Sequence, residues 1–207
     1  MKKDELIEKY PYLYHMAEKN SWSKISKQGL LSTSALLDLY EYDGAQRIQI
    51  EASLRPANVV IRHKQYGEAV IRDQHPMSDK GLQRCLSDGL TPTQWYKLLN
   101  ERVFFWVTEE RLIRLLSAGH YASAEHDVLV LDTAKIVKDY EKKITLCPMN
   151  SGCTKPFPHP RGKDTFLPIA KYPWEHWLEK RGRKGETVVE VAVIGSLQNV
   201  EIGRAHV

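Results

Sequence analysis

Three short runs of apolar residues, rich in β-branched and aromatic side chains, limit most strongly how this chain can fold. They cover residues 103–107, 128–131 and 187–194. Runs of this length are typical of buried β-strands. None approaches the about 20 apolar residues that a membrane-spanning helix needs. The sequence therefore predicts a sheet of several strands and no contact with a membrane.

Helix signals fill the intervals between these runs. Thr91 starts a capping box with Pro92 at the first helical position, and Ser21 precedes a helix that Gly29 would end. We also expect Ser34 to cap a helix over residues 35–40. We expect further helices at residues 78–86, after Thr108 and at residues 133–140. We expect further strands at residues 12–16 and 59–61. The pattern predicts an α+β fold with short helices around the sheet.

Composition indicates a single domain over residues 1–207. The chain is 42% apolar and 27% charged, which is ordinary for a globular protein. Its N-terminus mixes lysines with acids and has no apolar run, and it has three cysteines, so we expect a cytoplasmic protein without a secretory signal. The net charge of +4 permits contact with phosphates but does not demand it.

A long irregular segment precedes the last strand, over about residues 147–186. It holds six prolines and four glycines in forty residues. Loops of this length are uncommon in compact domains and are often functional. Its basic residues could form a solvated surface or meet phosphate groups: they are Arg161, Lys163, Arg181, Arg183 and Lys184. Cys147, Cys153 and His159 are spaced too widely for a typical zinc site, and we expect no metal.

Glu190 is the single acid in the apolar strand predicted over residues 188–194. Glutamate is a poor strand former and is rarely buried without a partner. Two interpretations stay open: an acid paired with an arginine at the end of a strand, or a carboxylate held at a cleft that the preceding loop could cover.

Two further polar positions are candidates for binding. His15 ends a predicted strand, between Tyr14 and Asn20, and is either structural or able to bond ligand hydroxyls. Residues 72–76, Arg-Asp-Gln-His-Pro, form either a binding loop or a hydrophilic turn. The phosphate-binding glycine motifs, H-E-x-x-H and G-x-S-x-G are all missing from the sequence, so the enzyme classes that depend on them lose their main support.

Three patches give the chain a resemblance to a known superfamily. The patches are Tyr14-His15-Met16-Ala17 with Asn20 and Gly29-Leu30-Leu31-Ser32, then residues 102–107 and a following helix, then residues 189–194 with 200–202. Together they resemble the DarT-like branch of the ADP-ribosyltransferase superfamily. The whole chain also resembles a bacterial family of uncharacterised proteins, through G-L-L-S-T-S-A-L-L-D, V-I-R-D-Q-x-P-M and R-G-K-D-T-F-L-P-I.

The DarT-like resemblance implies a split sheet and NAD as a substrate whose nicotinamide bond is cleaved. It implies that Glu190 is catalytic, with an arginine for which Arg47 is the first choice and Arg62 and Arg72 are alternatives. It also implies a set of NAD-binding residues: His15 and Asn20 at the ribose, Tyr14 or Phe105 against the nicotinamide, and Arg72 on a phosphate.

The same resemblance implies a nucleic-acid acceptor, DNA or RNA, modified at an unpaired or extruded base. Such a transferase could serve as a toxin or in phage defence and have a neutralising antitoxin as partner. The alternatives are a protein-modifying transferase, an RNA 2′-phosphotransferase of the same superfold, which would need several arginines around a phosphate, and a non-catalytic NAD- or nucleotide-binding module. An unrelated α+β protein also stays open.

Overall fold

The computed structural model describes residues 1–119, 121–182, 185–198 and 202–206. Its helices are α1 Lys3–Lys9, α2 Trp22–Gln28, α3 Thr33–Leu39, α4 Gly44–Glu51, α5 Asp79–Cys85, α6 Pro92–Asn100, α7 Glu109–Leu116, α8 Thr133–Tyr140 and α9 Trp174–Arg181. Its strands are β1 Tyr12–Glu18, β2 Leu30–Leu31, β3 Val59–His63, β4 Gly67–Ile71, β5 Arg102–Trp106, β6 His126–Asp132, β7 Ile144–Cys147, β8 Leu167–Pro168, β9 Glu190–Ile194, β10 Ser196–Leu197 and β11 Ile202–His206.

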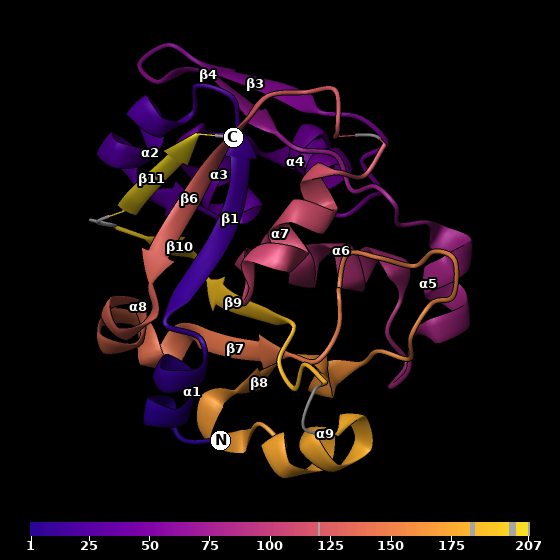
Figure 1. Ribbon diagram of the computed structural model, residues 1–207. Coiled ribbons are helices and arrows are strands. Elements are labelled where there is room, and N and C mark those ends of the chain that lie inside the picture. Colours follow the sequence, from indigo (N-terminus) through magenta and orange to yellow (C-terminus); the bar gives the residue numbers. More distant parts are fainter. Residues whose placement is uncertain (120, 183–184, 199–201, 207) are drawn as a thin grey trace.

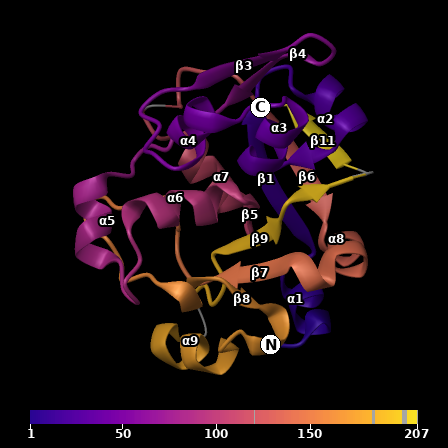
Figure 2. The same cartoon turned by 180° about the vertical axis from the view of Figure 1, so that it is seen from behind.

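The main sheet has seven strands in the order β11-β6-β1-β5-β9-β7-β8, and its ladders are antiparallel. Two small pairs, β10-β2 and β3-β4, lie outside it. Short helices surround the sheet, and the β3–β4 hairpin lies at the end of the molecule opposite α9 (Figures 1 and 2). The expected α+β class is confirmed.

The sheet is nearly interrupted between β1 and β5. β1 pairs with β6 along its whole length, and β5 pairs with β9 along its whole length. Between β1 and β5 the ladder contains only the pair Tyr14↔Trp106. In Figure 1, β1 and β6 run steeply across the direction of β9 and β7. Beyond Tyr14 and Trp106, therefore, the two halves of the sheet diverge.

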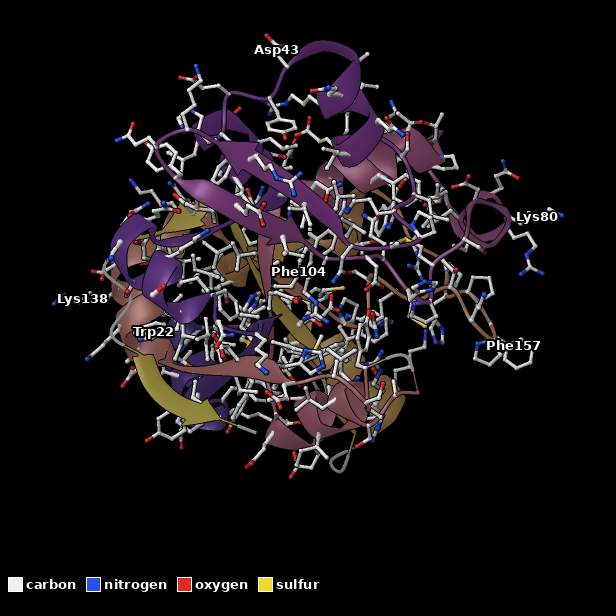
Figure 3. All side chains as sticks on the ribbon, turned by 90° about the horizontal axis from the view of Figure 1, so that it is seen from above. Trp22, Asp43, Lys80, Phe104, Lys138 and Phe157 are labelled. Carbon is white, nitrogen blue, oxygen red and sulfur yellow. The ribbon has the colours of Figure 1, made fainter. Side chains whose placement is uncertain are left out.

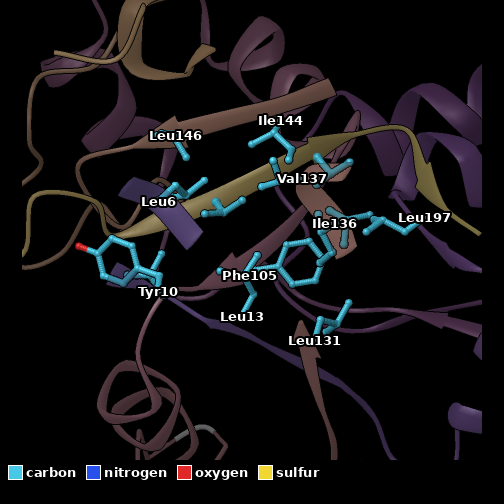
Figure 4. Close-up of a cluster of buried hydrophobic side chains, with 14 of the residues drawn as sticks. Leu6, Tyr10, Leu13, Phe105, Leu131, Ile136, Val137, Ile144, Leu146 and Leu197 are labelled. Carbon is cyan, nitrogen blue, oxygen red and sulfur yellow. The ribbon is translucent and has the colours of Figure 1, made fainter. Parts of the chain in front are cut away.

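Apolar side chains pack against both faces of the sheet. The largest cluster joins α1, β1, α8 and the inward residues of β9, and includes Phe105 (Figure 4). A second cluster lies on the other face and contains Trp95 of α6, Phe166 and Ala192. A third joins α3 and α4 to the β3–β4 hairpin. Val191 and Ala192 belong to different clusters, so β9 is covered on both faces, as its continuous apolar sequence predicts.

Local sequence signals are largely confirmed. The Thr91 capping box is present, and α2 begins and ends at the predicted residues. The expected cap at Ser34 is wrong: Ser32 caps α3 by accepting a hydrogen bond from the amide of Ala35, because the helix begins at Thr33. Strand β9 begins at Glu190, so this acid is its first residue.

Several elements differ from the sequence prediction. Helices α1 and α4 and strands β4 and β7 were not expected, and the segment over residues 147–186 contains α9 and the short strand β8 as well as loops. Helix α4 has a polar sequence with little periodicity, and tertiary packing through Ile50 stabilises it.

Gly29 must be glycine for two reasons. Its φ is +88°, and a Cβ atom would lie 2.6 Å from the carbonyl oxygen of Leu197. This close approach allows β2 to pair with β10 directly after the N-terminal strand and helix. Among the described helices, none is long and apolar enough to cross a bilayer.

Candidate functional site

A cavity of about 630 Å³ occupies the opening between the two halves of the sheet. Its wall combines residues 14–18 of β1, residues 102–106 of β5, the polar loop 72–77, residues 150–152 and Glu190. This volume lies in the range of small-molecule and cofactor sites. Segments from both ends of the chain therefore contribute to one cavity.

Three side chains share a row where the two halves of the sheet meet. Tyr14 pairs with Trp106, and Trp106 pairs with Glu190, so the three residues lie side by side across β1, β5 and β9. Directly paired residues project to the same face of a sheet. Tyr14, Trp106 and Glu190 all line the cavity. The row therefore places a carboxylate beside two aromatic rings.

Glu190 is 4% exposed, and its carboxylate accepts the backbone N–H of Ser151 at 3.2 Å to each oxygen. Burial raises the pKa of Glu190 to about 7, although the hydrogen bonds from Ser151 and the charges of Arg111 and Arg161 act in the opposite direction. A carboxylic acid that titrates near neutral pH can accept or release a proton under physiological conditions. Arg111 itself is paired with Glu186, so Glu190 is not the acid of a simple ion pair.

His15 lies in the gap between the two halves of the sheet. Its Nδ1 is 2.8 Å from the carbonyl oxygen of Phe104 in β5. A carbonyl can only accept, so Nδ1 carries the proton and Nε2 of the neutral ring is an acceptor. Burial and then the charge of Arg72 lower the pKa of His15, although the bond to Phe104 opposes this, and the neutral ring is favoured. His15 and Glu190 line the same cavity.

Arg72 anchors the wall on the β1 side. Its Nη1 lies 3.4 Å from a carboxylate oxygen of Glu18 and 3.2 Å from Nδ1 of His126, and its guanidinium lies 5.2 Å from the ring centre of Tyr121. Because arginine only donates, His126 accepts at Nδ1 and donates from Nε2 to the carbonyl of Tyr121 at 3.1 Å. The network fixes Arg72 at the cavity wall.

Arg55 and Arg102 are two further cations in the wall. The buried Arg55 donates to the carbonyls of Arg72 and Ile50 and to the side-chain oxygen of Asn100. Arg102 begins β5 and has a side chain that is 11% exposed. Sequence reasoning did not select either residue. Alternation along β5 could have indicated Arg102, because residues 102, 104 and 106 share one face.

The structure does not bring Arg47, the first choice for a catalytic arginine, to the cavity. Arg47 lies on α4, outside the cavity wall, and bonds Glu51 and Asp38. Arg62 is equally unsuited, since its side chain is 70% exposed and paired with Glu68. Of the three arginines considered, Arg72 is the one that lines the cavity.

The aromatic prediction at Phe105 also needs correction. Phe105 borders the cavity, but its ring packs in the main apolar cluster (Figure 4). Phe104 and Trp106 project to the Glu190 side of β5, because side chains alternate along a strand. Phe104 lies near the centre of the molecule in Figure 3. Asn20 lines the cavity in a left-handed turn with φ of +64°, a conformation that asparagine tolerates.

The basic residues predicted to meet nucleic acid differ from one another in exposure and in hydrogen-bond partners. Arg161 is 2% exposed and donates to the carbonyls of His159, Ser151 and Cys153, so its predicted role in nucleic-acid binding is wrong. Arg181 is partly buried and donates to the carbonyls of Glu186 and Pro148. The side chain of Lys163 is exposed. Arg183 and Lys184 lie outside the described residues.

Arg161 instead stabilises Ser151, the residue whose backbone N–H donates to Glu190. Its bond to the carbonyl of Ser151 is 2.7 Å long, and the N–H of the same residue donates to Glu190. The guanidinium also lies 5.6 Å from the ring centre of Trp95. Sequence reasoning missed Ser151, because its contribution is a backbone N–H in an irregular loop and no residue type signals it.

The fold and the cavity together define an α+β protein with a ligand-sized site at a break in an antiparallel sheet. The chain belongs to a family of unknown function, DUF7002, whose model matches residues 11–202. No curated protein and no solved structure matches the chain significantly.

Proposed function

We propose that the protein is an NAD-dependent mono-ADP-ribosyltransferase, with a fold of the ADP-ribosyltransferase type. The observation that carries the proposal is that His15 and Glu190 both line one cavity, although 175 positions separate them in the sequence. These are the two residues that the DarT-like motifs at opposite ends of the chain imply. The opening of the sheet between β1 and β5 supports the same conclusion.

The reaction cleaves the bond between C1 of the ribose and the nitrogen of nicotinamide. Nicotinamide leaves with the bonding electrons, and an acceptor atom forms a new bond to C1 and loses a proton. A carboxylate beside C1 stabilises the developing positive charge. Glu190 is suited to this role and, with a pKa near 7, to taking the acceptor's proton.

The other residues would hold the substrate. The Nε2 acceptor of His15 is suited to a ribose hydroxyl, and the rings of Tyr14 and Trp106 beside Glu190 are suited to a flat nicotinamide. Arg72 would bind phosphate. Asn20, at the turn after β1, would contact the ribose from the rim of the cavity.

The acceptor in the proposal is a base in DNA or RNA, as the DarT-like resemblance implies. Lys163 supports it as an exposed cation on the segment that leads to Glu190. A role as a toxin or in phage defence, with a neutralising antitoxin, follows from the same resemblance and belongs to the proposal. So does a cytoplasmic location, where both NAD and nucleic acid are available.

An RNA 2′-phosphotransferase is the second candidate, and a specific observation favours it. Arg55, Arg72 and Arg102 all line the cavity, and several arginines around one phosphate are what this reaction would need. The donors of Arg55 are occupied by protein oxygens, which leaves two arginines for a ligand.

The test is incubation with NAD labelled in its adenylate part and with separate pools of single-stranded DNA, duplex DNA, RNA and protein. Label in a nucleic-acid pool supports the proposal. Label in the protein pool would mean that the acceptor is a protein and not a nucleic acid. An additional arm with 2′-phosphorylated RNA tests the second candidate through loss of that phosphate. Glu190→Gln should abolish transfer while keeping NAD binding. Absence of transfer and of NAD hydrolysis by the folded wild type would refute the proposed enzyme.

A further inference from the structure

Arg161 is a buried cation whose direct partners are all uncharged. It is 2% exposed, and its three guanidinium nitrogens donate to the carbonyl oxygens of His159, Ser151 and Cys153 at 3.0, 2.7 and 2.7 Å. Among the residues that the structure describes, no carboxylate forms an ion pair with it. Buried charges are normally paired, because the cost of removing them from water is high. The charge of Arg161 therefore needs a compensating anion that lies beyond its direct contacts.

Glu190 is the complementary case, a buried carboxylate that forms no ion pair within the described part of the chain. Its two oxygens share the backbone N–H of Ser151, at 3.2 Å each. The carbonyl of the same residue accepts from Arg161. Ser151 thus presents the positive end of one backbone dipole to the anion and the negative end of another to the cation. One residue bridges two buried and opposite charges.

Helices α5 and α6 hold Arg161 at both its backbone and its side chain. Its amide donates to the carbonyl of Cys85, the last residue of α5, at 2.8 Å, and its carbonyl accepts from the amide of Ser87 at 2.9 Å. The guanidinium lies 5.6 Å from the ring centre of Trp95 in α6. Because Arg161 is fixed in this way, its bond to Ser151 restricts where the N–H of Ser151 can point.

We propose that Arg161 is a positioning residue, which holds Ser151 and, through it, fixes the carboxylate of Glu190 at the cavity. The inference deepens the proposed function, because the proposed reaction uses that carboxylate. The indirect contact has a chemical consequence. A direct two-pronged bond from arginine would occupy both carboxylate oxygens, whereas the single N–H of Ser151 leaves most of their lone pairs for a substrate.

The charge of Arg161 also favours the ionised form of Glu190 and so lowers its pKa, against the larger effect of burial. Arg111 acts in the same direction. The buried thiol of Cys147 lies opposite Glu190 on β7, and His15 lines the same cavity. These three groups remain when Arg161 is replaced. The pKa of Glu190 should therefore rise above about 7 in a variant that lacks the cation.

The first test is a pH titration of the intact wild-type protein by NMR, without any ligand. The side-chain carboxyl signal of Glu190, assigned by its loss in Glu190→Gln, should titrate near pH 7. The amide signal of Ser151 and the Nε–H signal of Arg161 should shift with the same midpoint. Both shifts should vanish in Glu190→Gln, which separates them from titration of the neighbouring His159. An Arg161 signal that does not follow Glu190 would overturn the proposal.

The second test measures the same carboxyl titration in variants of Arg161. Arg161→Met should raise the pKa of Glu190 by about one unit or more, and Arg161→Lys by less, because lysine keeps the charge but not the planar fork. Arg181→Met is the matched control, since Arg181 donates to two carbonyls of the same segment but not to Ser151. It should leave the pKa within about 0.3 units. An unchanged pKa in folded Arg161→Met would overturn the proposal; if that variant does not fold, an unchanged pKa and an unshifted Ser151 amide signal in Arg161→Lys would do so.

These outcomes are separate from the proposed function, because NMR needs no substrate. In the transfer assay Arg161→Lys should lower kcat, keep KM for NAD within about twofold, and move the midpoint of the pH–rate profile upward with the pKa measured by NMR. Coupled titration in a wild type that transfers no label keeps the positioning role and removes the transferase. Label transfer by a wild type in which Arg161 does not respond to Glu190 keeps the transferase and removes the positioning role.

Discussion

Replacing Glu190 by glutamine should stabilise the protein above neutral pH. The folded state raises the pKa of this carboxyl from 4.5 to about 7, chiefly through burial. At about 1.36 kcal/mol per pKa unit, the ionised side chain makes folding less favourable by about 3 kcal/mol. Glutamine has nearly the same shape, can still accept the N–H of Ser151, and has no charge to bury.

The pH dependence has a definite sign. Between pH 4.5 and 7 the folded wild type binds more protons at Glu190 than the unfolded chain does, so its stability falls as the pH rises through this window. The glutamine variant lacks this decrease. The difference in unfolding free energy between the variant and the wild type should therefore grow by about 3 kcal/mol from pH 4.5 to pH 8.

Urea unfolding followed by tryptophan fluorescence measures this difference, since the chain has five tryptophans. Glu179→Gln, at an exposed position of α9, is the control and should show no comparable growth. A Glu190→Gln difference that stays constant with pH would refute the reasoning. It would mean that Ser151, Arg111 and Arg161 compensate fully for burial of the charge.

Three further predictions follow from the same contacts. Arg161→Met should destabilise the protein by about 3 kcal/mol or more in urea unfolding, because three backbone carbonyls lose a charged donor, whereas Lys163→Gln should change stability by less than about 0.5 kcal/mol. Similar values for the two variants would contradict the structural role of Arg161. Gly29→Ala should cost about 2 kcal/mol or more, since its Cβ would meet the carbonyl of Leu197; Gly44→Ala, also at positive φ but with no atom within 4 Å of its Cβ, should cost less, and equal thermal shifts would argue against the clash. The rate of the proposed transfer should rise with pH and level off above about 7 as Glu190 ionises, and a flat pH–rate profile would exclude that carboxyl as the base.

The sequence predicted strands β1, β3, β5, β6 and β9 and the helices with strong caps, because these depend on neighbours in the chain. The continuous apolar pattern of residues 103–107 and the capping box at Thr91 each specify an element without tertiary information. Helix α4 lacks such a local signal. The sequence also singled out Glu190 and His15, since a polar residue at a strand that is otherwise apolar needs an explanation.

The rest of the site depends on contacts between distant segments, which composition cannot indicate. Arg72 and Arg47 look alike in the sequence, yet one lines the cavity and the other bonds Asp38 and Glu51 on a neighbouring surface. Arg161 looked like a surface cation in a loop rich in proline, yet it is among the most buried side chains. In each case the deciding quantity is which oxygens lie within reach of the guanidinium.

The described contacts around the cavity work against stability as well as for it. Glu190 carries a burial cost, Arg102 has an unused buried donor, and burial lowers the pKa of Arg102 and brings that of Arg55 to about 10. Residues selected for stability alone would be apolar at such positions, because replacing buried charges by well-packed apolar groups is often neutral or stabilising. Local conflicts of this kind concentrate at functional sites. These groups gather at the break between β1 and β5, and the rest of the interior packs into three apolar clusters. This contrast supports the proposal that the break is the ligand-binding site.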